Sequence, residues 1–274
     1  MGKIVRKEPL VEGVVLLEIE AERVASSAQV GQFVVLMPYE TSERIPISLH
    51  NWDRDKGTIE IVFQVVGRTT NELASLEVGE EPYALLGPLG KPLELQKYGL
   101  VVCIGGGLGI PPIYNIARGL RGVGNEVISI IGARTASLLI LEERIRSVSD
   151  KLLVCTDDGS YGEKGFVTDV LRKLLEADKI DLVIAIGPVP MMEAVANLTR
   201  PFEIKTIVSL NPLMLDATGM CGVCRVKVGG ETKFACVDGP KFDAHQVDFA
   251  DLKRRLAMYK EEERRALEEW KARI

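Results

Sequence analysis

The chain has 274 residues and a mass of 30.1 kDa, which exceeds one typical domain and predicts two compact domains with a smaller third element. Its 34 basic and 39 acidic residues give a net charge of -5, and this balance does not indicate a nucleic-acid partner, which typically needs a clustered basic surface. The sequence contains no run of 18 apolar residues, so it predicts no membrane span.

The amino terminus, MGKIVRKEPL, lacks the apolar stretch of a signal peptide. Arg6 also occupies the position at which a myristoylation motif needs Ser or Thr. We therefore expect a cytoplasmic protein. In that reducing compartment, clustered cysteines are more typical of a metal site than of disulfides.

The first 97 residues predict a small antiparallel β-barrel. Segments with β-branched and alternating apolar residues, separated by short turns, lie at 11–21, 31–38, 57–67 and 81–90. Short strands at such close spacing are typical of antiparallel barrels. We expect this domain to span residues 1–97.

Residues 98–207 predict a second domain, of the α/β class. Apolar strands alternate with helix-like stretches, and the strands are expected at 100–105, 126–133, 151–156 and 181–187. This alternation is typical of a parallel sheet covered by helices on both faces. A small cysteine-rich domain over 208–250 is expected to follow.

A charged helix is predicted for residues 251–274, at the end of the chain. Its apolar residues fall near one face and are Leu252, Leu256, Tyr259, Leu267, Trp270 and Ile274. Such a helix can pack on its own domain with a solvated charged face, or it can dock on a partner. The sequence leaves both interpretations open.

A glycine-rich loop follows the first strand of the predicted parallel sheet and contains Gly105, Gly106, Gly107 and Gly109. Glycine lets the backbone approach a phosphate closely, and the helix that follows offers free N–H groups and the positive end of its dipole. Prolines at 111 and 112 suit the first helical turn. The dinucleotide fingerprint G-x-G-x-x-G is not met, because Ile110 stands where the third glycine belongs. The alternative is a tight turn without a ligand.

Other loops follow strands of the same predicted sheet. Asp157 and Asp158 come after the third strand, and Gly187 and Pro188 come after the fourth. Ligands of open α/β sheets bind at the carboxyl ends of the strands, so these loops predict a nucleotide crevice together with the glycine loop.

The predicted barrel has candidate residues of its own. Pro46, Ile47 and Ser48 lie on a probable strand, while Val66, Gly67, Arg68, Thr69 and Thr70 precede a short helix. Thr69 and Glu72 have the spacing of a capping box, which would explain the segment by helix initiation alone. The same segment offers N–H groups, a hydroxyl and a guanidinium to a pyrophosphate. A barrel domain followed along the chain by a nucleotide-binding sheet is the domain order typical of a flavin reductase.

The spacing Asp216-x4-Cys221-x2-Cys224-x11-Cys236 predicts an iron–sulfur site. Plant-type 2Fe-2S clusters use C-x4-C-x2-C with a distant fourth cysteine, so Asp216 occupies the place of the first thiolate and is the predicted fourth ligand. The alternative is structural zinc, held by the three cysteines with Asp216 or His245.

The two cysteines outside this motif, Cys103 and Cys155, lie within apolar predicted strands. A cysteine without a nearby ligand partner is most simply a small buried hydrophobe, so we expect both to belong to the core.

With these motifs the chain resembles the ferredoxin-NADP reductase-like superfamily over essentially its whole length. The most specific stretch runs from Asn211 to Phe249. Within the superfamily it is similar to the group with a carboxy-terminal 2Fe-2S domain, which includes electron-transfer subunits of dihydroorotate dehydrogenase. It is more similar to the small subunits of NADH-dependent reduced ferredoxin:NADP oxidoreductase, also called FAD-containing subunits of sulfide dehydrogenase, since the dihydroorotate group has cysteine where Asp216 stands.

The resemblance implies that FAD lies between the barrel and the sheet. Ser48 and its neighbours would contact the flavin, Gly67 to Thr70 would contact its pyrophosphate, and the loops GGGLG and GPVPMM would receive NAD(H) or NADP(H). The family's flavin motif places its arginine where Ile45 stands, with Arg44 one residue earlier. No acid, base or nucleophile of the protein is required, because the cofactors carry the redox chemistry.

The resemblance also implies a heterodimer with a large subunit that carries a second flavin and 4Fe-4S clusters and performs electron bifurcation. The terminal helix could then dock on that subunit. The strand that ends at Ala133 has no acidic residue at its tip for a ribose hydroxyl, and Arg134 could meet a 2'-phosphate. We follow the relatives and expect NAD(H). The alternatives are a subunit of dihydroorotate dehydrogenase or of another oxidoreductase, and, outside enzymes, a zinc-containing nucleotide-binding module.

Overall fold

The computed structural model describes residues 2–272, and its contacts divide the chain into two compact units. The first unit comprises residues 1–91, 211–239 and 248–274, and the second comprises 92–210 and 240–247. The cysteine region therefore groups with the amino-terminal strands rather than with the segment that precedes it. The predicted domain divisions at residues 97, 207 and 250 remain proposals.

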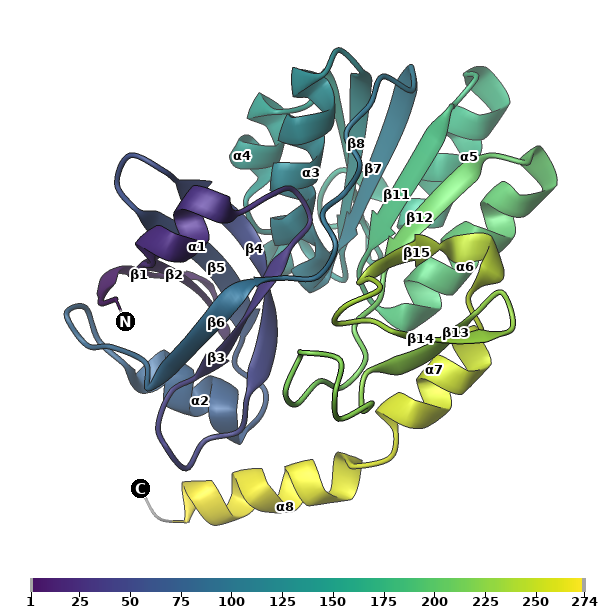
Figure 1. Cartoon of the computed structure of the whole chain (residues 1–274). Coiled ribbons are helices and arrows are strands. Elements are labelled where there is room, and N and C mark those ends of the chain that lie inside the picture. The colour runs from purple at the N-terminus through teal and green to yellow at the C-terminus, as the bar shows by residue number, and fades with distance from the viewer. Residues whose placement is uncertain (1, 273–274) are drawn as a thin grey trace. The chain divides into compact units, whose positions relative to one another are not determined.

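The first unit is built on a six-stranded antiparallel sheet with the order β1-β2-β5-β4-β3-β6 (Figure 1). Its strands are β1 Ile4–Val11, β2 Val14–Glu20, β3 Phe33–Met37, β4 Ile45–Asp53, β5 Thr58–Gln64 and β6 Ala84–Leu89. The first hairpin joins Val11 to Val14 through a two-residue turn, in which Gly13 has φ of 71°. Such turns need a left-handed residue, which glycine adopts without a steric cost.

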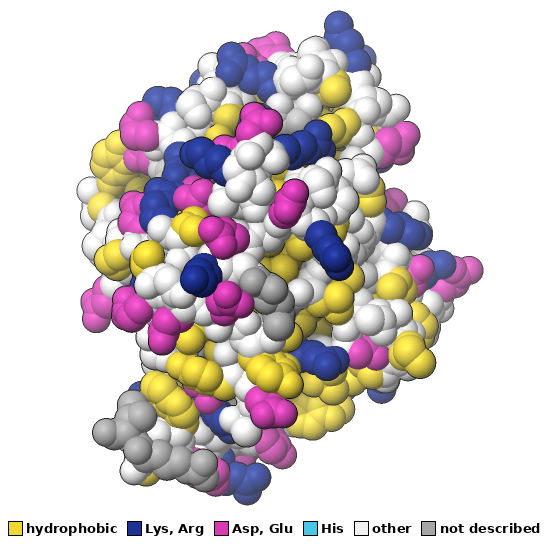
Figure 2. All heavy atoms as spheres, turned by 60° about the vertical axis from the view of Figure 1, so that its left-hand side comes forward, with side chains coloured by type: hydrophobic (Ala, Val, Ile, Leu, Met, Phe, Trp, Pro, Cys, Tyr) yellow, Lys and Arg dark blue, Asp and Glu magenta, His cyan; other side chains and the backbone are white. Residues whose placement is uncertain are grey.

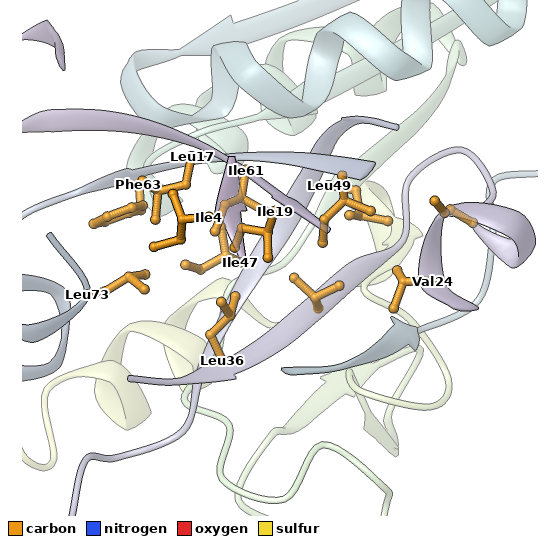
Figure 3. Close-up of a cluster of buried hydrophobic side chains, with 14 of the residues drawn as sticks. Ile4, Leu17, Ile19, Val24, Leu36, Ile47, Leu49, Ile61, Phe63 and Leu73 are labelled. Atoms are coloured by element: carbon orange, nitrogen blue, oxygen red, sulfur yellow. The ribbon is translucent and has the colours of Figure 1, made fainter. Parts of the chain in front are cut away.

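Five neighbouring strands of this sheet, from β1 across to β3, contribute to one hydrophobic core, which Figure 3 shows. Ile4 of β1 and Leu36 of β3 join Leu49 and Ile61 of the central strands, and all four side chains are at most 1% exposed. The short helices α1 Glu22–Ser27 and α2 Arg68–Ser75 add apolar residues to the same cluster. Each fully buried side chain of this kind contributes about 1.5–3 kcal/mol to folding. The antiparallel architecture predicted from the alternating segments is confirmed.

The second unit is an α/β sheet with the order β10-β9-β8-β7-β11-β12-β15. Its strands are β7 Leu100–Gly106, β8 Glu126–Ala133, β9 Lys151–Thr156, β10 Glu163–Lys164, β11 Leu182–Ile186, β12 Lys205–Ser209 and β15 Lys241–Asp243. The helices are α3 Ile110–Gly122, α4 Glu142–Ser147, α5 Val167–Ala177 and α6 Val189–Thr199, with single 3-10 turns at 107–109, 136–138, 200–202 and 244–246. The predicted parallel sheet is confirmed.

Helices cover both faces of this sheet, which explains the nearly continuous apolar sequence of its strands. In Figure 1, α3 and α4 lie on one face and α5 and α6 on the other. From β7 the chain builds outward to β8 and β9, and it then returns to place β11 on the other side of β7. The strand order therefore reverses between β7 and β11. Ligands of such sheets bind at this switch point.

The cysteine region forms a hairpin of β13 Arg225–Val228 and β14 Glu231–Phe234. Gly229 and Gly230 have φ of 60° and 80°, as a two-residue turn of this type requires. A few residues later the chain adds β15 to the second unit, where it pairs antiparallel with β12. This pairing was not expected from the sequence, because a three-residue strand carries almost no periodic signal.

The terminal segment predicted as one helix over 251–274 forms two helices, α7 Phe249–Leu256 and α8 Lys260–Lys271. Three basic residues end α7 and three acidic residues begin α8, so each terminus matches the dipole of its own helix. Of the predicted apolar stripe, Leu252 is buried, Leu267 and Trp270 are half-buried, and Tyr259 is exposed between the helices. Ile274 lies outside the described residues.

Within the first unit, α8 contacts α2, in agreement with packing on its own domain. Among the described residues, no helix is long and apolar enough to cross a membrane. On the face that Figure 2 shows, basic and acidic side chains are interspersed over the surface.

Candidate functional site

The cysteine loop brings two of the four predicted cluster ligands, Cys224 and Cys236, close together. The Sγ atoms of Cys224 and Cys236 lie 3.2 Å apart, and both residues are buried. This distance is far longer than a disulfide bond and places two sulfurs side by side. Cys221 is exposed.

Asp216 is held at the start of the same loop by two backbone amides. Its carboxylate accepts hydrogen bonds from Thr218 N at 3.0 Å and from Cys221 N at 2.8 Å. These bonds lower the pKa of Asp216, with the Thr218 amide as the largest cause. Ala217, between Asp216 and Thr218, has φ of 58°, a left-handed conformation that turns the chain back toward Cys221. The carboxylate is therefore ionised and fixed beside the residue that begins C-x2-C.

The environment of Cys236 favours the thiol when no metal is bound. Burial is the largest cause that raises its pKa to about 12, the neighbouring Cys224 adds to the shift, and a hydrogen bond from the Gly219 amide opposes it. Metal binding must therefore displace a proton from this site. The Gly219 amide is already directed at the sulfur that would carry the negative charge.

These residues fit a two-iron cluster better than a single ion. The side chains of Cys224 and Cys236 form one pair, and Asp216 is tied to Cys221. A 2Fe-2S cluster needs two protein ligands on each of its two irons, which matches this pairing.

His245, the alternative zinc ligand, belongs to the second unit. Its Nε2 lies 3.0 Å from Thr199 Oγ1, so the ring is engaged with α6 rather than with the cysteines. Cys103 and Cys155 are buried in the sheet, and burial raises the pKa of each thiol to about 12. Their predicted place in the core is confirmed.

The glycine loop and the loop after β11 meet at the switch point of the sheet. Gly105 is paired with Ile186 across the two strands. A Cβ atom at Gly109 would lie 1.8 Å from the carbonyl oxygen of Ile186, and one at Gly106 would lie 2.4 Å from Met191 Sδ. A side chain at Gly109 would therefore force the two loops apart, whereas one at Gly106 would displace the side chain of Met191.

The rest of this crevice consists of backbone suited to a phosphate. Gly107 has φ of 53°, and no atom lies within 4 Å of the position where a Cβ would be, so its surface is open. A Cβ at Gly187 would lie 3.0 Å from Gly106 O, and Pro188 then caps α6. Helix α3 begins directly after Gly109, with Pro111 and Pro112 in its first turn as predicted. A close-packed glycine cradle at a helix amino terminus is the arrangement that nucleotide phosphates require.

The acidic loop after β9 is tied to the loop after β8. Asp157 N donates to Ala133 O, and Asp158 N donates to Arg134 O. The carboxylate of Asp158 accepts hydrogen bonds from the amide and hydroxyl of Ser160, and the hydroxyl is the main cause that lowers its pKa. Asp158 is therefore engaged within its own loop, while Arg134 lies at the same edge of the sheet.

On the antiparallel sheet, the candidate strand residues face in opposite directions. Ile47 belongs to the hydrophobic core, so its backbone alone can contact a ligand. The neighbours Pro46 and Ser48 are only half-buried, and alternation along the strand directs them to the other face. Ser48 pairs with Phe33 of β3.

The capping box predicted from Thr69 and Glu72 is wrong. Helix α2 is capped at Gly67, and Thr70 Oγ1 accepts hydrogen bonds of 2.9 Å from both Val66 N and Gly67 N. Thr69 is buried one residue inside the helix. Gly67 has φ of -120° and no side chain to compete with the Thr70 hydroxyl, so the cap forms two residues earlier than the sequence pattern indicated.

Glu72, which sequence reasoning assigned to the cap, instead binds side chains. It is 4% exposed, and its carboxylate accepts hydrogen bonds from Arg68 Nε at 2.7 Å and Ser42 Oγ at 2.6 Å. Arg68 also donates to Thr41 O at 3.3 Å. The guanidinium is thus held beside the start of α2, where Arg68 and the helix amides could meet an anion together.

Comparison with known proteins identifies the family. Residues 211–248 match the family model described as the iron-sulfur cluster binding domain of dihydroorotate dehydrogenase B. Over 264 residues the chain is 44% identical to a Thermotoga maritima protein named dihydroorotate dehydrogenase B (NAD(+)), electron transfer subunit homolog, with coverage of 96% of this chain and 93% of the relative. The chain belongs to the family of dihydroorotate dehydrogenase B electron transfer subunits.

Another member of this family of electron transfer subunits, from Shouchella clausii, is 35% identical over 241 residues, which cover 84% of this chain and 91% of that protein. Among solved structures, the chain matches a chain in the structure of an NADH-dependent reduced ferredoxin-NADP oxidoreductase, which was reported for insights into flavin-based electron bifurcation. The TM-score is 0.94, the sequence identity is 42%, and the match covers 98% of each chain. A cytochrome P450 reductase from Amycolatopsis, at 22% identity and a TM-score of 0.64 over 74% of this chain and 66% of that chain, shares the fold. The resemblance seen in the motifs is confirmed.

Proposed function

We propose that the chain is an electron-transfer subunit that exchanges hydride between NAD(H) and FAD and passes single electrons through a 2Fe-2S cluster to a large flavin and iron–sulfur subunit. The observation that carries this proposal is the loop in which Cys224 and Cys236 lie 3.2 Å apart while Asp216 is fixed to Cys221. When bound, the flavin couples the two-electron chemistry of a nicotinamide to the one-electron chemistry of a cluster. The protein's own residues bind and orient these groups.

Asp216, Cys221, Cys224 and Cys236 are the proposed cluster ligands. Asp216 supplies an oxygen donor that is already ionised, so it loses no proton on binding. Cys236 must lose its proton, and the Gly219 amide stabilises the thiolate that results.

Proposed flavin contacts lie on β4 and at the start of α2. Pro46, the backbone of Ile47 and Ser48 would contact the ring system from the start of β4, where the side chains of Pro46 and Ser48 face away from the core. The segment from Val66 to Thr70 would hold the pyrophosphate, supported by the dipole of α2 and by Arg68.

Proposed nicotinamide nucleotide contacts lie at the carboxyl edge of the parallel sheet. Gly105, Gly106, Gly107 and Gly109 would hold the phosphates, Gly187 and Pro188 would line the neighbouring side, and Asp157 and Asp158 lie in the loop after β9. The relatives named for NAD(+) favour NAD(H) over NADP(H).

The partner is a large subunit with FAD and 4Fe-4S clusters, and we propose a cytoplasmic heterodimer. Asp216 favours the NADH-dependent ferredoxin:NADP oxidoreductase type, in which electron bifurcation takes place. The second candidate is a true dihydroorotate dehydrogenase subunit, which the names of the curated relatives favour. Purification of the natural complex would separate the two, since they differ in the partner.

The cofactor content of the anaerobically purified protein tests the proposal. We expect about two iron atoms, two labile sulfides and one FAD in each chain. Cys224→Ala should lose iron and sulfide while it keeps the flavin, whereas the matched variant Cys103→Ala, which removes a buried core thiol, should keep all three. Zinc without labile sulfide in the wild-type protein would contradict the proposal.

A further inference from the structure

Two arginines from different elements bind the two residues that separate Cys221 from Cys224. The guanidinium of Arg225 donates to Gly222 O at 2.9 Å, and that of Arg255 donates to Val223 O at 3.0 Å. Both carbonyl groups within the C-x2-C motif therefore have a cationic partner. Hydrogen bonds to a charged donor are about twice as strong as neutral ones.

Arg255 reaches the loop because α7 is fixed against the β13–β14 hairpin. Asp248 caps α7 by accepting a hydrogen bond from Asp251 N at 2.8 Å, and its own amide donates to Lys227 O of β13 at 2.9 Å. Leu252, one turn before Arg255, is 1% exposed. The last turn of α7 is thus held at a defined position, and Arg255 projects from that turn.

These contacts orient the loop amides. In a planar trans peptide the C=O and N–H groups point in opposite directions. When Gly222 O and Val223 O face the arginines, the amides of Val223 and Cys224 face away from them. Within the described part of the chain neither amide has a protein acceptor. Sulfur atoms of a cluster bound by Cys221 and Cys224 would supply the missing acceptors.

The charge on Arg255 is poorly screened by solvent. Its Nε atom is shielded from water and has no acceptor among the described residues. The side chain lines a small cavity of about 60 Å³ whose other walls are mostly apolar, formed by Pro212, Leu213, Val223, Arg225, Leu256, Met258 and Tyr259. A cation in such surroundings acts on nearby charge more strongly than an exposed one.

We propose that Arg225 and Arg255 are positioning residues that fix the C-x2-C loop and raise the reduction potential of its cluster. The inference rests on the proposed function. Reduction adds one negative charge to the cluster, and both guanidinium groups and the two directed amides stabilise that charge.

The test is a spectroscopic redox titration of the holoprotein and its variants Arg225→Gln, Arg255→Gln and Arg255→Lys. The control is Arg254→Gln, which removes the same charge from the adjacent residue, whose side chain is 73% exposed and bound to Asp251. At a fixed potential we expect the ratio of reduced to oxidised cluster to fall about tenfold in Arg255→Gln, a shift of ~59 mV for one electron. In Arg225→Gln, whose side chain is exposed and better screened, the ratio should fall about threefold. Arg254→Gln should change the ratio of reduced to oxidised cluster by less than about twofold.

Arg255→Lys keeps the charge and one donor, so it should retain most of the wild-type potential. If Arg255 only stabilised the loop, Arg255→Gln and Arg255→Lys would lose similar amounts of cluster. The clusters that stay bound would then keep the wild-type reduction potential. The inference would be overturned if the cluster in Arg225→Gln and the cluster in Arg255→Gln both had the same reduction potential as the cluster in Arg254→Gln. If Arg255→Gln loses its cluster, the comparison of Arg225→Gln with Arg254→Gln decides, and equal reduction potentials of these two variants would overturn the inference. A wild-type protein without a cluster would instead contradict the proposed function.

Discussion

At the scale of single residues, the loops at the switch point of the parallel sheet make close contacts that a side chain would disturb. Gly109 lies against the backbone of Ile186, so the two loops at the switch point fit only when this position lacks a Cβ, whereas Gly106 lies against the movable side chain of Met191. Glycine is therefore required at Gly109 by a backbone contact as well as by any ligand. The proposed phosphate site and the packing of β7 against β11 share the same residues.

Gly109→Ala is expected to lower the free energy of unfolding by about 1–3 kcal/mol and to weaken NADH binding, because its Cβ would lie 1.8 Å from Ile186 O. The control is Gly122→Ala at the end of α3, where no atom lies within 4 Å of the added Cβ. That variant should be as stable as the wild-type protein, or more stable by about 0.5–1 kcal/mol. Urea unfolding and NADH titration measure both effects, and equal stability of the two variants would contradict the packing account.

Local sequence predicted some of these residues and misassigned others. The spacing from Asp216 to Cys236 indicated a cluster because ligand spacing along one loop is a local property. Glu72 was assigned to a capping box, since the sequence does not reveal that Ser42, thirty residues earlier, lies beside it. Arg255 has no local signal at all, because the carbonyl it binds lies 32 residues away.

At the scale of elements, the region after the cluster loop is joined to the parallel sheet. The short strand β15 pairs with β12, and His245 just beyond it bonds Thr199 at the end of α6. Thr206 of β12 donates to the same Thr199 hydroxyl at 2.7 Å. Arg200 adds a bond of 3.0 Å to His245 O. This network connects strand, helix and the segment that follows the cysteines.

The network predicts a loss of stability in mild acid. Burial is the main cause that lowers the pKa of His245, and Arg200 adds to it, while Asp243 and the Ala196 backbone oppose the shift. Because the unfolded ring has its usual pKa near 6.5, the unfolded state binds more protons below that pH, and the free energy of unfolding should fall as the pH decreases through this range.

His245→Gln keeps a polar side chain that does not titrate. Its free energy of unfolding should therefore fall less between pH 7.5 and pH 5.5 than that of the wild-type protein. Urea unfolding of both proteins at the two pH values measures the difference. The other histidine, His50, is present in both and cancels in the comparison. Equal pH dependence would contradict the lowered pKa of His245.

The element types were largely predictable, whereas several boundaries were not. Alternating and continuous apolar runs distinguished the antiparallel from the parallel sheet, because exposure of one face leaves a period of two residues. The break between α7 and α8 was missed, although the change from basic to acidic residues near residue 258 marks it. Charge at helix termini was a better guide there than the apolar stripe.

At the scale of the whole molecule, chain order and spatial units differ. The first unit collects three separate stretches of sequence, and residues 240–247 leave it to complete the sheet of the second. Sequence patterns divide a chain into consecutive segments, so this exchange could not be predicted. Its consequence is that β12 and β15 pair within the second unit, although the cysteine region between them in the sequence belongs to the first.

The central claim is that electrons from NADH reach both a flavin and an iron–sulfur cluster in this chain. Its most direct test is an anaerobic absorbance spectrum of the purified protein, recorded before and after addition of NADH and, separately, of NADPH. We predict flavin bands with a broad iron–sulfur shoulder, both bleached by NADH about tenfold faster than by NADPH. A colourless protein that carries zinc would contradict the redox function, and faster bleaching by NADPH would assign Arg134 to a 2'-phosphate and overturn the choice of NAD(H).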